Sequence, residues 1–122
     1  MALGKDLGTY ELKWTGTRYS EEGSTVTVDC DGTATDFGTV LGSLILRAEP
    51  GSTQGTASWR GGSFPDNGER SAAIGEGTWE DSGTNQWRIR LLVNSSDGRT
   101  FGTDGTLDLA SRTLNGKLLD WS

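Results

Sequence analysis

The 122-residue chain contains no histidine, one cysteine and two prolines. Without histidine, a Ser-His-Asp triad, a Cys-His pair, a haem histidine and an ordinary zinc site are all excluded. One cysteine cannot form a disulfide within the chain, which argues against a disulfide-stapled secreted domain. The scarcity of proline argues against a disordered linker.

The chain also lacks a long apolar run and an excess of positive charge. Its longest apolar segment lies around residues 44–46 and is too short to span a membrane. Residues 1–6 show no apolar core of a signal peptide. The net charge of -6 argues against a basic surface for nucleic acid or anionic lipid. We therefore expect a cytoplasmic protein that binds neither nucleic acid nor membranes.

Glycine is abundant, with 19 residues, and there are five tryptophans. The dipeptide Gly-Thr recurs along the chain at irregular spacing, which indicates a bend followed by a β-branched residue that starts a strand. No ten-residue window has the periodicity of an amphipathic helix. The sequence predicts one all-β domain over residues 1–122 with many short strands.

Alternation of apolar and polar residues predicts about eight antiparallel strands in up-and-down order. We expect them near residues 9–19, 25–30, 43–48, 54–60, 72–80, 86–93, 100–109 and 113–121. Closure into a small barrel would remove the exposed edges of such a sheet, and glycines within strands suit barrel corners. A β-sandwich is the alternative.

Two connections and two breaks are also predicted. Asp31-Gly32 has the composition of a hairpin turn, and residues 61–70 read as a long loop that forms a lid or rim. Asp104-Gly105 and Asn115-Gly116 are expected to interrupt the last two strands.

The segment 72–93 is the clearest predicted hairpin, with residues 81–85 as its connector. Folding its halves together is expected to place Trp79 against Trp87 and Glu76 opposite Arg90.

Glu76, Arg88 and Arg90 are the catalytic candidates of this hairpin. If their face lined a closed lumen, the desolvated charges could bind an anionic ligand or shift a pKa for proton transfer. The alternative, which the apolar character of the opposite face favours, is an exposed cross-strand ion pair of a few tenths of a kcal/mol.

The aromatic residues are the candidates for ligand binding. Tyr10, Trp14, Trp59, Trp79 and Trp87 lie on the apolar faces of predicted strands, with small residues nearby. They could be plain core, or they could line a space for a hydrophobic or planar ligand. If they faced outward, they would suit stacking on sugar rings.

No metal or cofactor is expected. Asp29, Asp31 and Asp36 lack the spacing of a calcium loop, so they read as turn residues. Cys30 alternates with Val26 and Val28, which predicts a small core residue.

The strand starts Gly8-Thr9-Tyr10-Glu11-Leu12-Lys13-Trp14 and Gly77-Thr78-Trp79-Glu80 resemble those of small lipocalin-like barrels. The glycine-rich meander is also similar in style to allene oxide cyclase-like barrels. These resemblances imply a lumen that holds a ligand.

Three functions follow as hypotheses. The first is binding of a small hydrophobic or planar molecule in a barrel lumen, by a monomer or a small homo-oligomer. The second is a cofactor-free cyclase or isomerase acting in the lumen, and the third is a carbohydrate-binding module or lectin.

Overall fold

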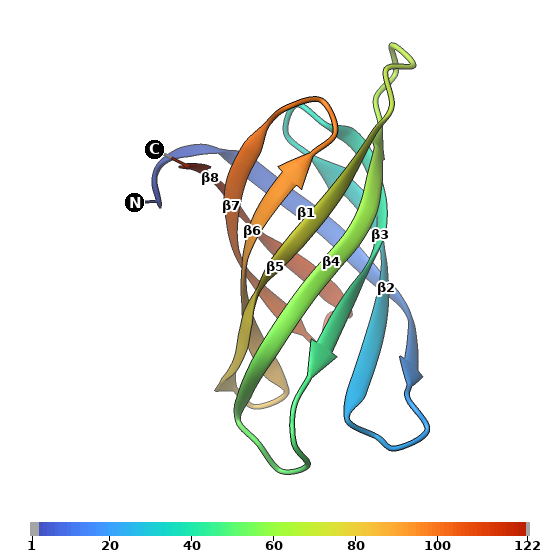
Figure 1. Cartoon of the computed structure of the whole chain (residues 1–122), viewed down its shortest axis with the longest axis vertical. Coiled ribbons are helices and arrows are strands. Elements are labelled where there is room, and N and C mark those ends of the chain that lie inside the picture. Colours follow the sequence, from blue (N-terminus) through green and yellow to red (C-terminus); the bar gives the residue numbers. More distant parts are fainter. Residues whose placement is uncertain (1–2, 122) are drawn as a thin grey trace.

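The computed structural model describes residues 3–121 and shows a closed eight-stranded antiparallel barrel (Figure 1). Each strand pairs with the next in the chain, and β8 closes the barrel against β1. The predicted up-and-down barrel is therefore confirmed, and the β-sandwich is not the fold. The strands are β1 (Leu3–Tyr19), β2 (Thr25–Ala34), β3 (Gly38–Arg47), β4 (Gln54–Phe64), β5 (Ser71–Gly83), β6 (Gln86–Ser95), β7 (Thr100–Asp108) and β8 (Thr113–Trp121). No helix able to cross a membrane is found within this described part.

The predicted hairpin turn at Asp31-Gly32 is wrong, because β2 continues through it to Ala34. Gly32 pairs with Leu12 of β1. A Cβ atom on Gly32 would lie 2.0 Å from the Glu11 carbonyl oxygen, so this glycine permits a close approach between strands. The turn itself comes later, at residues 35–37.

The predicted loop over residues 61–70 is also too long. Residues 61–64 belong to β4, and only residues 65–70 connect it to β5. This hairpin extends beyond the end of the barrel, at the top of Figure 1. β4 therefore continues four residues beyond the predicted strand end at residue 60, and Ser63 still pairs with Ser71 of β5.

The expected interruptions of β7 and β8 are absent, and their glycines serve another purpose. Gly105 pairs with Gly116, and Gly116 pairs with Tyr10 of β1. A Cβ atom would lie 2.0 Å from the Tyr10 hydroxyl at Gly105 and 2.8 Å from it at Gly116. The tyrosine ring therefore lies along the wall over two positions without side chains, an arrangement that protects strand glycines from solvent.

Trp59 is placed in the same manner on the opposite wall. A Cβ atom on Gly42 would come 2.3 Å from the Trp59 ring, and one on Gly61 would come 2.8 Å from it. The Trp59 ring thus fills the space that side chains at Gly42 and Gly61 would take.

The hairpin of β5 and β6 forms with a different register from the one predicted. Trp79 pairs with Ile89, while Trp87 pairs with Asp81 and not with Trp79. Glu76 pairs with Leu92 instead of Arg90. The reason is that β5 extends to Gly83 and the turn shrinks to Thr84-Asn85, so the partners move along the ladder.

Side chains from all eight strands fill the interior, as alternation on a barrel requires. The largest completely buried ones are Leu44, Ile89, Leu107 and Val28. Above and below this packed middle, the two ends of the barrel each contain a depression, and the two depressions share no lining residue.

Candidate functional site

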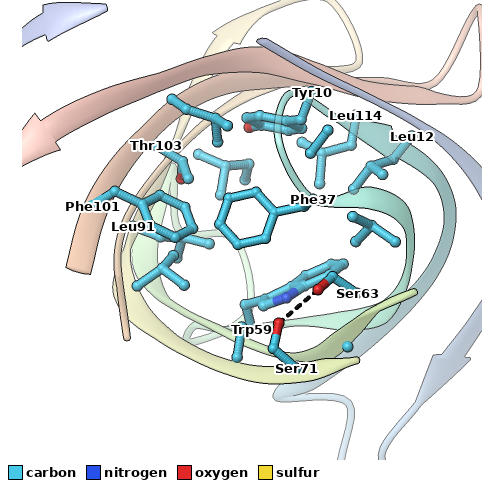
Figure 2. Close-up of a pocket in the computed structure, with 17 residues that line it drawn as sticks. Tyr10, Leu12, Phe37, Trp59, Ser63, Ser71, Leu91, Phe101, Thr103 and Leu114 are labelled. Carbon is cyan, nitrogen blue, oxygen red and sulfur yellow. Dashed lines mark hydrogen bonds between the residues drawn. The ribbon is translucent and has the colours of Figure 1, made fainter. Parts of the chain in front are cut away.

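An apolar cavity opens at the barrel end that carries the β2–β3, β4–β5 and β6–β7 turns (Figures 1 and 2). Its volume, as accessible to a water-sized molecule, is about 80 Å³. Seventeen residues line it, and none is charged. Its aromatic members are Tyr10, Phe37, Trp59 and Phe101. The lining has the apolar, aromatic character of a small-molecule pocket.

The five aromatic residues predicted to line one lumen are divided between the two ends. Tyr10 and Trp59 line the cavity, whereas Trp14, Trp79 and Trp87 line the depression at the opposite end. There the Trp14 and Trp87 rings meet edge to face at 6.5 Å between centroids. The Trp79 ring nitrogen donates a hydrogen bond of 3.1 Å to the Arg47 carbonyl oxygen.

Burial separates these tryptophans further. Trp59 and Trp79 are buried, and Trp14 and Trp87 are half-buried and pack against the core. None of the four lies on the outer face of the barrel, which is the arrangement that sugar stacking from the outside would need.

Sequence reasoning missed Phe37, which occupies the mouth of the cavity. Phe37 lies in the β2–β3 turn between two residues with positive φ, Asp36 (66°) and Gly38 (75°). Its ring points into the lumen, 5.1 Å from the Phe101 ring between centroids (Figure 2). Because the segment reads as a glycine-broken turn, only the isolated aromatic between polar residues could have drawn attention to it.

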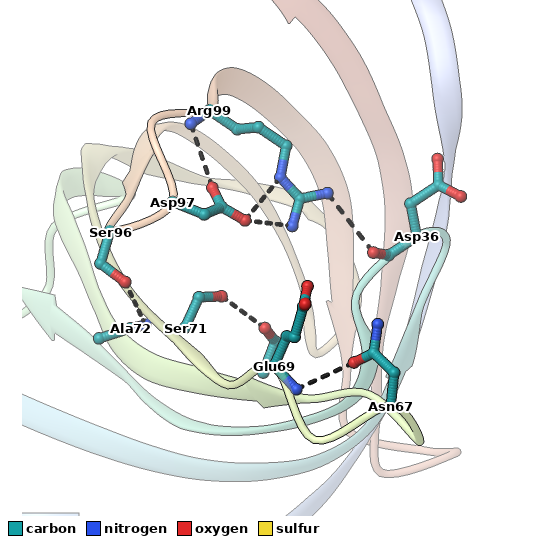
Figure 3. A network of polar contacts seen from close by, with 9 residues as sticks. Asp36, Asn67, Glu69, Ser71, Ala72, Ser96, Asp97 and Arg99 are labelled. Carbon is teal, nitrogen blue, oxygen red and sulfur yellow. Dashed lines mark hydrogen bonds and ion pairs between the residues drawn. The ribbon is translucent and has the colours of Figure 1, made fainter.

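Arg99 of the β6–β7 turn holds Phe37 from outside. Its guanidinium carbon lies 3.8 Å from the centre of the Phe37 ring, a cation–π geometry. Arg99 also donates a hydrogen bond of 3.4 Å to the Asp36 carbonyl oxygen and one of 2.9 Å to the Asp97 carboxylate (Figure 3). Arg99 lowers the pKa of Asp97 to about 2. Arg99 thereby connects the β6–β7 turn to the β2–β3 turn across the mouth of the cavity.

Few polar atoms face the cavity. The Ser63 and Ser71 hydroxyls bond to each other at 2.6 Å (Figure 2). The Tyr10 phenol is buried, which raises its pKa well above its ordinary value and keeps it protonated. Thr103 Oγ1 is buried and has no hydrogen-bond partner among the described residues.

The catalytic candidates Glu76, Arg88 and Arg90 lie on the outer face and do not come together. Glu76 accepts hydrogen bonds from Ser58 (2.7 Å) and Arg60 (2.9 Å), both of which lower its pKa.

The two arginines have other partners. Arg88 binds Asp104 at 2.6 Å, and Arg90 binds Glu80 at 3.0 Å. The predicted pairing of Glu76 with Arg90 is therefore wrong. All three candidate side chains belong to exposed ion pairs, so they do not form a polar lumen.

The remaining polar candidates lie apart from the cavity. Cys30 is buried in the core, and burial raises the pKa of its thiol to about 12, so it is not a reactive thiolate at neutral pH. Asp29 binds Arg18 and Ser43 on the outside of the barrel. Over residues 3–121, no group of three acidic, cysteine or histidine side chains is placed to hold a metal ion.

Comparison with protein-family models, with curated proteins and with solved structures gave no match for this chain.

Proposed function

We propose that the protein binds a small hydrophobic, largely planar molecule in the cavity lined by Tyr10, Phe37, Trp59 and Phe101. The observation that carries this proposal is the lining of the cavity, which is apolar over nearly its whole surface and has no charged side chain. Aromatic walls offer flat surfaces on which a planar ligand can stack. In this proposal the protein holds a ligand in its lumen, as the resemblance of its strand starts to those of lipocalin-like barrels implies.

The geometry of the walls supports a flat ligand in particular. Tyr10 and Trp59 lie along opposite walls over glycine positions, so their faces and not their edges border the space. Phe37 and Phe101 add two rings at the mouth. A flat molecule in this space would be enclosed by rings, and burying its apolar surface would contribute about 25 cal/mol per Å² before the costs of association.

The test is a fluorescence titration with N-phenyl-1-naphthylamine, a neutral probe that brightens in apolar surroundings. We expect saturable binding to the wild-type protein. Ala73→Phe should abolish it, because Ala73 lines the cavity and a phenyl ring there would fill it. The matched control is Ala72→Phe, since the neighbouring side chain is exposed on the outer face.

Two results would contradict the proposal. One is no binding of the probe to the wild-type protein. The other is equal binding by both phenylalanine variants, which would place the probe outside the cavity.

A further inference from the structure

Thr103 is the one buried side chain of the cavity lining whose hydroxyl lacks a hydrogen-bond partner among the described residues. Its side chain is 7% exposed and lies on β7 between Leu91 of β6 and Leu118 of β8, which both line the cavity. Figure 2 shows its oxygen at the border of the lumen. Folding has taken this hydroxyl out of water without giving it a well-aligned hydrogen bond.

A structural role does not explain this hydroxyl. Its neighbours in the strand ladder are leucines, and valine has the same shape without the polar atom, so valine would fill the position at less cost. The other hydroxyls of the lining differ, because Ser63 and Ser71 bond to each other. The Tyr10 phenol lies within hydrogen-bond reach of the Thr103 hydroxyl, which offsets part of the rise that burial causes in the pKa of Tyr10, but the two groups are not aligned as a regular hydrogen bond.

We infer that Thr103 Oγ1 is the polar anchor of the cavity, and that the ligand is an apolar molecule with one uncharged oxygen, such as a carbonyl, that hydrogen-bonds to it. This inference rests on the proposed function and specifies the ligand class. A charged group is disfavoured, because no charged side chain lines the cavity and an unpaired buried charge is very costly. A carbonyl oxygen would accept a hydrogen bond from Thr103, and the protonated phenol of Tyr10 lies beside the same position.

The experiment compares two probes of nearly equal shape, 2-acetonaphthone and 2-isopropenylnaphthalene, which differ by a carbonyl oxygen against a CH₂ group. Their dissociation constants are measured by displacement of N-phenyl-1-naphthylamine. We expect the wild-type protein to bind the ketone roughly 3–10-fold more tightly, the range that one hydrogen bond gives. Thr103→Val should remove this preference, mainly by weakening the ketone, whereas Thr103→Ser should keep it.

The matched control is Thr106→Val, because Thr106 lies on the same strand and is exposed outside the barrel. It should leave the ketone preference unchanged. The urea midpoint of Thr103→Val should equal or exceed that of the wild type, since the variant loses an unsatisfied polar group.

Each failure has a distinct meaning. If the reporter probe does not bind the wild-type protein, the proposed function fails. If the reporter probe binds but neither naphthalene displaces it, the inference is overturned. If both bind equally to the wild type, or if Thr103→Val keeps the ketone preference, the inference is overturned while lumen binding stands. A clear loss of stability in Thr103→Val would show a structural hydroxyl and would also overturn it.

Discussion

Gly105 shows how a single residue sets the position of an aromatic ring. The Tyr10 hydroxyl occupies the space where a side chain of Gly105 would lie, and the Asn115 carbonyl oxygen would be only 2.7 Å from an added Cβ atom. The tyrosine can lie flat against the wall because this position is empty. The open lumen therefore depends on a residue that contributes no side chain to it.

We predict that Gly105→Ala lowers the free energy of unfolding by about 1–3 kcal/mol, the usual cost of overpacking a filled site. Urea unfolding followed by tryptophan fluorescence measures this. Gly4→Ala is the control, because nothing lies within 4 Å of its added Cβ atom. Combining Gly105→Ala with Tyr10→Phe should reduce the cost, since the closest contact is removed. An alanine tolerated at both glycines would contradict this account of Tyr10.

The order of the strands in the barrel and the alternation of inward and outward side chains were largely predictable from the sequence. Such alternation is a local pattern of apolar and polar residues. Leu44, Ile89 and Leu107 all face inward as expected. The partners across the hairpin of β5 and β6 were not predictable, since a shorter turn changed every pair without changing which side of a strand faces the core.

The site was less predictable than the fold. Thr103 alternates with Phe101 and Leu107 on the inward side of β7, so the polar residue at an inward position was a usable signal. The division of the aromatic residues between the two ends of the barrel could not be predicted, because it depends on how far each residue lies along a tilted strand.

The β2–β3 and β6–β7 turns act together at the mouth, since Arg99 contacts both the Phe37 ring and the Asp36 carbonyl oxygen. We predict that Arg99→Gln makes N-phenyl-1-naphthylamine dissociate roughly 2–5-fold faster, as expected for loss of a partly exposed cation–π contact. Stopped-flow displacement measures this rate. Arg18→Gln is the control, because Arg18 forms an exposed ion pair with Asp29 on the part of β1 remote from the cavity. Equal rates for both variants would show that Arg99 does not restrain the mouth.

For the molecule as a whole, ion pairs and hydrogen bonds on the outer face connect stability to pH. Several carboxyl groups have a lowered pKa in the folded protein because they accept hydrogen bonds from hydroxyls or arginines: Asp29, Glu76, Asp97, Asp104 and Asp108. A carboxyl group whose pKa is lower in the folded than in the unfolded protein stabilises the fold above its unfolded pKa. That contribution is lost as the pH falls through the folded value.

The free energy of unfolding should therefore fall steadily as the pH is lowered from about 5 toward 2, the window between ordinary carboxyl pKa values and that of Asp97. Asp97→Asn isolates one contribution. At pH 7 the variant should be less stable by under about 1 kcal/mol, because the pair with Arg99 is partly exposed and screened by solvent. The difference should shrink strongly by pH 2, where about half of the wild-type carboxyl groups are protonated. Urea unfolding at several pH values measures both curves, and a difference that stayed constant down to pH 2 would mean that Asp97 stabilises the turn by shape and not by charge.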